Sequence, residues 1–269
     1  MYFEFYGLKE APFNITPDPR FLYFSPRHKD AFDHLIYGIE QKKGFIELVG
    51  EVGSGKTTLC RAVLAKLPKK VQTALILNPT LSDTQLLRAI LHDLGLTVKG
   101  RDRLGYIEQL NQYLLFMEKE GFTVAVFIDE AQNLLPGTME QIRLLSNLET
   151  DQHKLMQIVL IGQPELEERL ARTDLRQLRQ RIIVRCKLEP LNEIETGEYI
   201  MHRLSVAGVA PDVAFDTEAV HLVFKHGHGT PRITNTICDR AMLAGYVDGS
   251  RIIRAIHVKR AIQEVEVSA

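Results

Sequence analysis

No stretch of the sequence is apolar over the roughly 18 residues that a membrane-spanning helix needs. The N-terminus, MYFEFY, also lacks the basic start and long apolar segment of a secretory signal peptide. There is no low-complexity tract and no repeat of about 20–50 residues, and the composition excludes collagen-like and wholly disordered chains. The 269 residues, 45% of them hydrophobic, are expected to form a soluble protein of one large or two smaller domains.

Net charge is also nearly absent, because 33 Lys and Arg are set against 34 Asp and Glu. This balance excludes a global field that attracts DNA or an acidic membrane, although a local basic patch can still do so. The three cysteines, Cys60, Cys186 and Cys238, are widely spaced and lie outside any CxxC motif. Such cysteines are typical of reduced thiols in a cytoplasmic protein. The histidines are not grouped as metal ligands, and no Ser-His-Asp or Cys-His arrangement is recognisable.

Aromatic residues are concentrated at the start of the chain. Of the 12 Phe and 8 Tyr, eight lie within residues 2–24, interleaved with Pro12, Pro17 and Pro19. Because proline suppresses long helices, we expect an extended, turn-rich strap whose rings anchor it to the core. Contact with a nucleotide base or a neighbouring subunit is the alternative role of these rings. A helix is predicted over residues 28–41. The strap and this helix together form the first of three predicted parts of the chain, residues 1–40.

From Gly44 onward, short apolar runs alternate with amphipathic segments. Strands are predicted over residues 45–49, 73–77, 123–128, 155–161 and 182–188, and helices over 57–67, from 82, over 104–119 and from 138 to about 148. Ser82 with Gln85, and Thr138 with Gln141, have the spacing of helix-capping boxes. Five strands separated by helices predict a parallel αβα sheet with right-handed crossovers over residues 41–190.

Beyond Pro190 the strand signal disappears. Helices are predicted over residues 193–207, 217–225, 232–246 and 256–265, separated by glycines and a proline. The third predicted part, residues 191–269, is therefore a small all-helical domain.

The strongest motif lies where the first predicted strand meets the first helix of the sheet. It fits G-x-x-x-x-G-K-[ST] and comprises Gly50, Glu51, Val52, Gly53, Ser54, Gly55, Lys56, Thr57 and Thr58. Glycines let the chain curl so that backbone N–H groups point at phosphate oxygens, and the helix N-terminus adds positive potential. Lys56 can bridge the β- and γ-phosphates, and the Thr57 hydroxyl can ligate Mg²⁺. The motif predicts nucleotide binding.

A second motif is the apolar run VAVFI that ends in Asp129 and Glu130. Asp129 is predicted to hold Mg²⁺ at the edge of the sheet, directly or through water. Glu130 is predicted to polarise the attacking water, since a carboxylate within reach of the nucleophile can take its proton. Hydrolysis, as opposed to passive nucleotide sensing, depends on Glu130.

Two amides stand at the ends of predicted strands. Gln163 ends the strand beside the one that carries Asp129, and Asn78 ends the strand that follows the phosphate-loop helix. Side chains at these positions can orient the water or restrain Glu130. A turn-forming role is the alternative for each of them.

Basic residues are dense from Arg169 to Lys187. A solvated helix face is the ordinary explanation of such a run, and nucleic-acid contact is another, although no interleaved aromatic residues support it. Arg179 and Arg181 stand immediately before the last strand, where an arginine can reach a neighbouring subunit's γ-phosphate. Farther on, Gly229-Thr230-Pro231-Arg232 opens a helix, and Arg232 can lean over the bound phosphate and report its loss as a domain rotation.

These elements in this order resemble an AAA+ ATPase, a P-loop NTPase with a helical lid. The segments Phe5-Tyr6-Gly7-Leu8 and PFNITPDPRFLY, residues 12–23, resemble the opening of the general secretion pathway protein A family, and DEAQNL, residues 129–134, also matches its pattern. The resemblance implies γ-phosphate sensing by Asn78 and Gln163, a lid sensor at Arg232 and an arginine finger at Arg181 or Arg179, of which Arg181 is preferred.

The resemblance further implies an oligomeric ATPase that uses ATP, ADP and Mg²⁺ and supports assembly of a bacterial secretion or type IV pilus apparatus. Family members often continue into a membrane span and a wall-binding domain, so the chain is expected to be the cytoplasmic part of such a protein or a short relative. Two alternatives stay open. One is a DNA-associated regulator of transposition or replication, and the other is a nucleotide-gated scaffold with weak hydrolysis.

Overall fold

The computed structural model describes residues 2–77, 79–99, 102–150 and 154–268. The chain forms two compact units. One comprises Met1–His28, Glu51–Leu59 and Glu189–Ala269, and the other Lys29–Gly50 and Cys60–Leu188. No helix of the described residues is both long and apolar enough to cross a membrane. The three-part division of the chain expected from its sequence stays a prediction.

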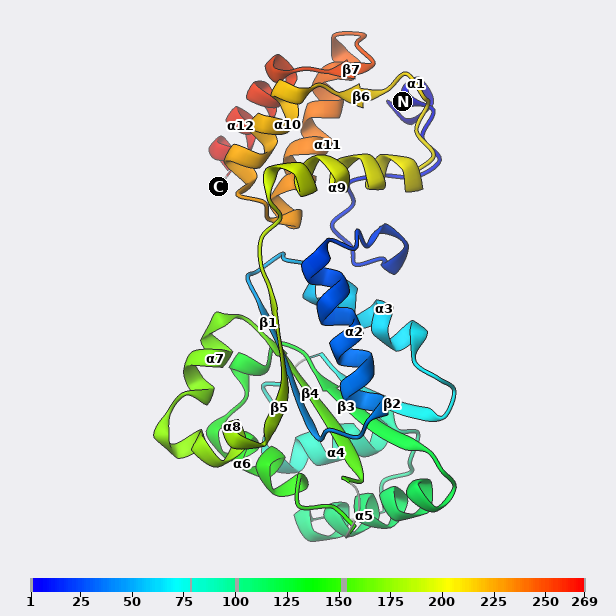
Figure 1. The fold of residues 1–269 in the computed structure, drawn as a ribbon, viewed down its shortest axis with the longest axis vertical. Helices are drawn as coiled ribbons and strands as arrows, with labels where there is room; N and C mark the ends of the chain where they lie inside the picture. The colour runs from blue at the N-terminus through cyan, green and yellow to red at the C-terminus, as the bar shows by residue number, and fades with distance from the viewer. Residues whose placement is uncertain (1, 78, 100–101, 151–153, 269) are drawn as a thin grey trace. The chain divides into compact units, whose positions relative to one another are not determined.

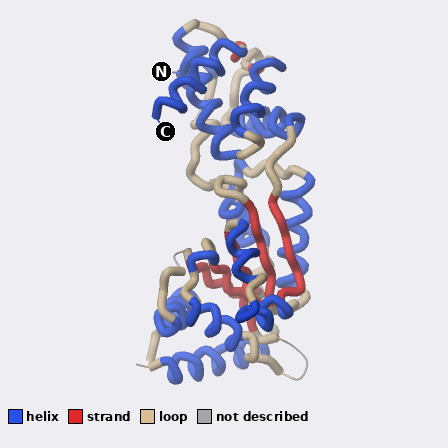
Figure 2. Tube along the Cα trace, turned by 90° about the vertical axis from the view of Figure 1, so that its left-hand side faces the viewer, coloured by secondary structure: helices blue, strands red, loops and turns tan. Residues whose placement is uncertain are grey.

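The second unit is built on a five-stranded parallel sheet, as predicted (Figures 1 and 2). Its strands are β1 (Phe45–Gly50), β2 (Val71–Ile76), β3 (Thr123–Ile128), β4 (Met156–Gly162) and β5 (Ile182–Leu188). They are arranged in the order β2-β3-β4-β1-β5. Because all strands are parallel, the residues that follow β1, β3 and β4 leave the sheet at the same edge.

Burial explains which strands are central. Every residue of β1 and β4 is buried, including Glu47 and Gln157, as expected of largely apolar strands covered on both faces. The edge strand β5 instead alternates buried and exposed residues, and the side chain of Ile183 is 67% exposed. Charged residues at the exposed positions of β5, Arg185 and Lys187, keep this edge from pairing with another chain.

Helices cover both faces of the sheet. They are α2 (Pro26–Glu40), α3 (Lys56–Lys66), α4 (Asp83–Asp93), α5 (Arg103–Lys119), α6 (Pro136–Leu145), α7 (Pro164–Leu170) and α8 (Arg176–Arg181), with one-turn helices η2 (Ala131–Asn133) and η3 (Thr173–Leu175). Apolar side chains of α4 to α8 pack with Phe45 and Val49 in one core. Gly38 of α2 lies against Ile46 and Val184, whose side chains point to the opposite face.

The two predicted capping boxes have different outcomes. Ser82 and Gln85 cap α4 reciprocally, as predicted. The prediction for Thr138 is wrong, because α6 begins at Pro136 and the Thr138 hydroxyl donates to the carbonyl oxygen of Leu81, 2.7 Å away. Proline fixes the backbone angle that a first helical residue needs, which explains the earlier start.

The first unit contains α1 (Tyr2–Tyr6), η1 (Pro19–Phe21), α9 (Glu193–Val206), α10 (Thr217–Gly227), α11 (Pro231–Val247) and α12 (Ala255–Ser268). The C-terminal helices are as predicted, but β6 (Ala214–Phe215) and β7 (Ile252–Ile253) form a parallel pair where no strand was expected. The helix α1 also differs from the extended strap expected there. It ends before the first proline, so nothing in residues 2–6 prevents a helical turn.

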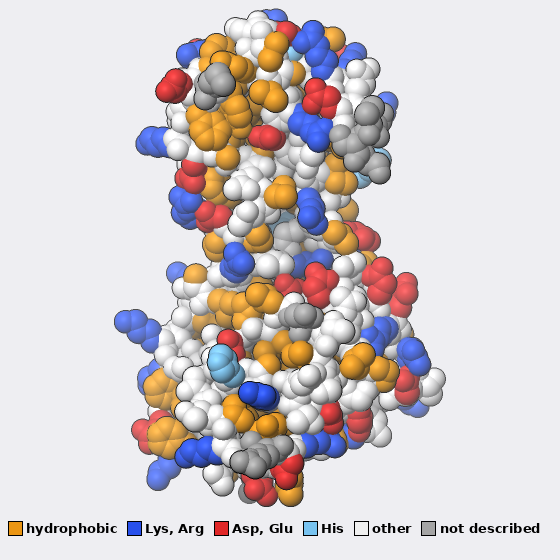
Figure 3. Space-filling model, turned by 180° about the vertical axis from the view of Figure 1, so that it is seen from behind, with side chains coloured by type: hydrophobic (Ala, Val, Ile, Leu, Met, Phe, Trp, Pro, Cys, Tyr) orange, Lys and Arg blue, Asp and Glu red, His pale blue; other side chains and the backbone are white. Residues whose placement is uncertain are grey.

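Aromatic residues of the N-terminal segment belong to the core of this helical unit. Tyr6, Phe13 and Phe21 are buried among residues of α9 to α12. The guanidinium of Arg203 on α9 donates to the carbonyl oxygens of Pro12 and Asn14 and lies 4.8 Å from the centre of the Phe21 ring. One buried arginine therefore satisfies backbone carbonyls of the segment and stacks on it. Apolar side chains are also exposed on the surface of this unit (Figure 3). The most exposed of them include Ile194 and Val247.

Candidate nucleotide-binding and hydrolysis site

The predicted phosphate loop lies between the end of β1 at Gly50 and the start of α3 at Lys56. Gly53 and Gly55 have φ angles of 77° and 97°, a left-handed region that favours glycine. The Ser54 amide donates to the carbonyl oxygen of Glu51 at 3.1 Å, and the Lys56 Nζ donates to the same oxygen at 2.9 Å. The loop is thus a tight turn leading into a helix N-terminus, the form that binds phosphate. Val52 is exposed, and Thr57 and Thr58 are half-buried in the first turn of α3.

His28 supports this loop from the N-terminal turn of α2. Its side chain is 3% exposed, its Nε2 lies 3.0 Å from the Ser54 carbonyl oxygen, and its Nδ1 lies 2.8 Å from the Ser25 hydroxyl. A carbonyl oxygen only accepts, so Nε2 carries the proton and Nδ1 accepts from Ser25. Burial lowers the pKa of His28 below the ordinary histidine value, which keeps the ring neutral. No sequence motif indicated this residue.

Arg232 meets the phosphate loop directly, within the same unit. Its amide donates to the Gly53 carbonyl oxygen at 3.2 Å, and a Cβ atom at Gly53 would lie 2.5 Å from the Arg232 Cβ. The turn before α11 is equally tight, since a Cβ atom at Gly229 would lie 1.9 Å from the Leu191 carbonyl oxygen. The structure thus brings together the predicted phosphate loop and the predicted lid sensor.

In the second unit, Asp129 and Glu130 follow β3 directly. Asp129 is 5% exposed, and its carboxylate accepts the Glu130 amide at 2.9 Å. Glu130 has a φ of 52°, a left-handed conformation uncommon for a residue other than glycine. Its Oε2 accepts from Gln163 Nε2 at 3.0 Å, which joins the residues that end β3 and β4. The structure therefore brings Glu130 and Gln163 together, and Asn78 lies outside the described residues.

Two further residues of this network were not predicted. Gln132 Nε2 donates to the same Glu130 oxygen at 2.6 Å, and Gln132 Oε1 accepts from the backbone N–H of Gln163 at 3.2 Å. Arg169 of α7 donates to the carbonyl oxygens of Gln132 and Leu134. Arg169 belongs to the basic run that the sequence made conspicuous, but nothing local indicated its partner.

The candidate finger arginines lie elsewhere in the second unit. Arg181 donates to Ser146 and Asn147, and with Phe45 and Met156, the first residues of β1 and β4, it lines a pocket of about 250 Å³. It is therefore at the opposite edge of the sheet from Glu130, and the structure does not bring these two together. Arg179 is exposed on α8, and its carbonyl oxygen accepts from Arg185 at 2.9 Å. A finger acts on a neighbouring subunit, so both assignments stay predictions.

A Mg²⁺ ion needs oxygen ligands, and the residues predicted for it supply them. Asp129 provides a carboxylate directly after β3, and Thr57 provides a hydroxyl in the first turn of α3. Magnesium is commonly held by one or two carboxylates together with substrate phosphates and water, so each of these two side chains is of a type that suits the ion. Among the described residues, no group of three His, Cys, Asp or Glu side chains forms another metal site.

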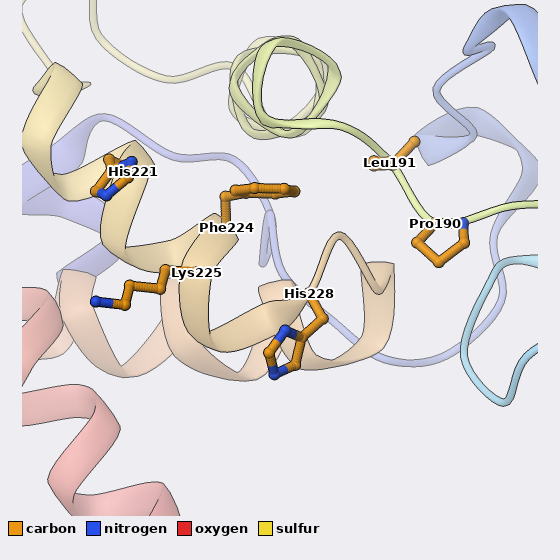
Figure 4. Close-up of a pocket in the computed structure, with 6 residues that line it drawn as sticks. All are labelled: Pro190, Leu191, His221, Phe224, Lys225 and His228. Carbon is orange, nitrogen blue, oxygen red and sulfur yellow. The ribbon is translucent and has the colours of Figure 1, made fainter.

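A separate pocket of about 450 Å³ lies within the helical unit (Figure 4). His221, Phe224, Lys225 and His228 come from α10 and its end, and Pro190 and Leu191 come from the segment before α9. None of the residues predicted from the sequence to bind or hydrolyse nucleotide lines this pocket.

Comparison with known proteins agrees with this geometry. Residues 39–170 match the family model described as an AAA domain. The chain is 44% identical over its full 269 residues to general secretion pathway protein A of Aeromonas hydrophila. Residues 39–170 are thus an AAA domain, and the chain is related over its full length to general secretion pathway protein A. It spans about half, 49%, of the length of that relative.

Solved structures show the same fold at low sequence identity. The ORC2 protein of Aeropyrum pernix, in ADPNP-ADP complexes, matches with a TM-score of 0.67 and 16% identity over 94% of this chain and 73% of its own. The Aeropyrum pernix ORC1 protein, in complex with DNA, matches with a TM-score of 0.70 and 18% identity over 96% and 70%. The predicted AAA+ architecture, a parallel five-stranded core followed by a helical region, is confirmed.

Proposed function

We propose that this AAA+ protein binds ATP with Mg²⁺, hydrolyses it to ADP, and does so as a homo-oligomer. The observation that carries hydrolysis is the position of Glu130 directly after β3, with its carboxylate oriented by the amide of Gln163. A carboxylate fixed beside the metal-binding aspartate can take a proton from the attacking water. When bound, Mg²⁺ would neutralise phosphate charge, with Asp129 and Thr57 as its ligands.

The remaining predicted residues have separate roles in this proposal. Backbone amides of residues 50–58 and the Lys56 ammonium hold the phosphates. Arg232, whose amide is bound to Gly53, senses the phosphates from the helical domain, residues 191–269. Asn78 and Gln163 sense the γ-phosphate, and Arg181 or Arg179 acts on a neighbouring subunit's site. The division into a strap and helix (residues 1–40), a core (41–190) and a lid belongs to the same proposal.

The biological process is proposed from the relative. Similarity to general secretion pathway protein A supports a proposed role in assembling or regulating a bacterial secretion or type IV pilus-type envelope apparatus, with proteins of that apparatus as the proposed partners. The proposed location is the cytoplasm, either free or as the cytoplasmic part of a protein associated with the inner membrane. The cysteines agree with a reducing compartment, since all three are free and buried.

A DNA-associated regulator is the alternative, and a fold shared with a DNA-bound protein raises it. The contacts of the basic run weigh against it. Arg169 binds two backbone carbonyls, Arg181 binds Ser146 and Asn147, and Arg185 lies 3.6 Å from the buried Glu47 carboxylate. Arginines committed to such contacts within the chain leave fewer cations for phosphates of a nucleic acid.

The test is ATP turnover measured across a range of protein concentrations. We expect turnover per subunit to rise as subunits associate, and Glu130→Gln to abolish turnover while ATP still binds. Intact turnover in Glu130→Gln overturns the catalytic assignment, and intact turnover in both Arg179→Ala and Arg181→Ala overturns shared sites. DNA-stimulated turnover with a steep salt dependence supports the DNA-associated alternative. ATP-dependent oligomers, seen by light scattering, with minimal turnover support a nucleotide-gated scaffold.

A further inference from the structure

The side chain of Gln132 also contacts Glu130, and it has no role in the ATP hydrolysis proposed above. We propose that Gln132 is a positioning residue, which orients the Glu130 carboxylate for attack by water. This inference rests on the proposed hydrolysis of ATP and adds to it a residue outside the predicted catalytic set.

The orientation of the Gln132 amide follows from its partners. Its oxygen lies 3.2 Å from the backbone nitrogen of Gln163, and a backbone N–H can only donate. The amide oxygen must therefore face Gln163, which turns the NH₂ group toward Glu130, where Nε2 lies 2.6 Å from Oε2. The assignment of oxygen and nitrogen in this amide is thus set by chemistry.

Both amides act on one oxygen of the carboxylate. Gln132 and Gln163 each donate to Glu130 Oε2, at 2.6 and 3.0 Å. Among the described residues, no hydrogen-bond donor to Oε1 is found, which leaves that oxygen to accept a proton. Hydrogen bonds to a charged acceptor are the strong ones, so two of them fix the rotation of the carboxylate about its last bond.

The turn that carries Gln132 is itself held in place. Arg169 donates to the carbonyl oxygens of Gln132, within the one-turn helix η2, and of Leu134, which immediately follows it. Gly162 at the end of β4 leaves room for the Gln132 side chain, since a Cβ atom there would lie 2.8 Å from Gln132 Oε1. Gln132 is therefore braced by α7 on one side and by the end of β4 on the other, as a positioning group must be.

The decisive variant is Gln132→Glu, which keeps the size of the side chain. The new carboxylate still accepts the backbone N–H of Gln163 but cannot donate to Glu130, and its charge also repels the Glu130 carboxylate. Gln132→Met, which is uncharged and has no donor, is therefore measured beside it and should show the same loss. We expect kcat for ATP hydrolysis to fall about 10- to 100-fold, because small misplacements of a reacting group cost that much. The Kd for a fluorescent ATP analogue should stay within about twofold of wild type, which a merely structural disturbance of the site would not allow. Gln263→Glu, an equal charge change at an exposed position of α12, should leave both unchanged.

Three outcomes separate this inference from the proposed function. Turnover by Gln132→Glu within twofold of wild type, or above it, overturns the positioning role while Glu130→Gln remains inactive. Intact turnover by Glu130→Gln overturns the hydrolytic assignment itself and this inference with it. In the double variant Glu130→Gln, Gln132→Glu, the second change should cause no further loss, because both act at one step. Should Gln132→Glu fail to fold by circular dichroism, Gln132→Met, uncharged and without a donor, gives the same test.

Discussion

The Nε2 atom of His28 lies 3.0 Å from the carbonyl oxygen of Ser54, in the middle of the phosphate loop. The imidazole thereby connects the N-terminal turn of α2, through Ser25 and His28, to the loop that is proposed to bind phosphate. This connection gives a first prediction.

Replacing His28 by leucine should weaken ATP binding. One buried hydrogen bond contributes about 0.5–1.5 kcal/mol, so the Kd should rise about twofold to twelvefold. His28→Gln, whose amide can donate to the Ser54 carbonyl, should lie between wild type and His28→Leu. His34→Leu on the exposed face of the same helix is the matched control. Titration with a fluorescent ATP analogue measures all three, and wild-type affinity in His28→Leu would contradict the prediction.

Acid should destabilise the protein through its buried histidines. Burial lowers the pKa of His28, His202 and His257 in the folded state. The unfolded chain then binds more protons than the folded one once the pH falls through the ordinary histidine value of about 6.5. The free energy of unfolding should therefore decrease from pH 7.5 to pH 5.5.

The histidine variant isolates one of these groups. His28→Gln should flatten the pH dependence by up to about 1.4 kcal/mol per pH unit, the contribution of one proton. Urea unfolding at several pH values measures it. An unchanged slope in His28→Gln, or greater stability of the wild type at pH 5.5 than at pH 7.5, would count against the assignment.

Gly53 and Gly95 allow backbone strain to be separated from crowding. Both have a φ of 77°, but a Cβ atom at Gly53 would lie 2.5 Å from the Arg232 Cβ, whereas nothing lies within 4 Å of one at Gly95. Gly95→Ala should cost only the left-handed strain, about 1–2 kcal/mol in unfolding free energy. Gly53→Ala should cost more and also weaken ATP binding.

A second substitution tests the cause. Adding Arg232→Gly to Gly53→Ala removes the atom that clashes, so the pair should be more stable than the sum of the single changes predicts. Denaturant titration of the four proteins gives the coupling, and strictly additive values would exclude the contact.

Arg203 should be essential for the attachment of the N-terminal segment. Its buried guanidinium bonds the carbonyl oxygens of Pro12 and Asn14 and the Tyr199 hydroxyl. Arg203→Met leaves the two carbonyl oxygens without this donor, which should cost about 1–3 kcal/mol for each and expose the chain around residues 9–25 to protease. Arg88→Met on the exposed surface of α4 should change stability by less than about 0.5 kcal/mol. Limited proteolysis with mass spectrometry reads the result, and a cleavage pattern identical to that of wild type would refute it.

The sheet could be predicted from the sequence because each of its strands is marked by an apolar run of its own residues. Thr123–Ile128 and Ile182–Leu188 have the bounds that their apolar runs and flanking residues indicate. The strands β6 and β7 could not be found, since two residues carry no periodicity. The one-turn helices, with three residues each, and α8, with six, are also too short to show a helical period, so tertiary contacts decide whether they form.

The candidate site likewise contains residues that could be predicted from the sequence and residues that could not. Residues in local motifs, such as Lys56 and Glu130, can be read directly from the chain. His28 and Arg169 act on carbonyl oxygens 26 and 37 positions away, at Ser54 and Gln132. Because every residue has a backbone carbonyl oxygen, the sequence does not indicate which carbonyl such a side chain will bind. Arg181 was conspicuous by its position before β5, yet its side chain binds Ser146 and Asn147.

The close approach of Gly229 to Leu191 limits which amino acids position 229 can hold. The Leu191 amide donates to the Gly229 carbonyl oxygen at 2.9 Å, while the Leu191 carbonyl occupies the place that a Cβ atom at Gly229 would need. The segments that precede α9 and α11 are thus held together by a close main-chain contact. Any other amino acid at Gly229 adds a Cβ atom where the Leu191 carbonyl lies, so we expect related chains that keep this contact also to keep the glycine.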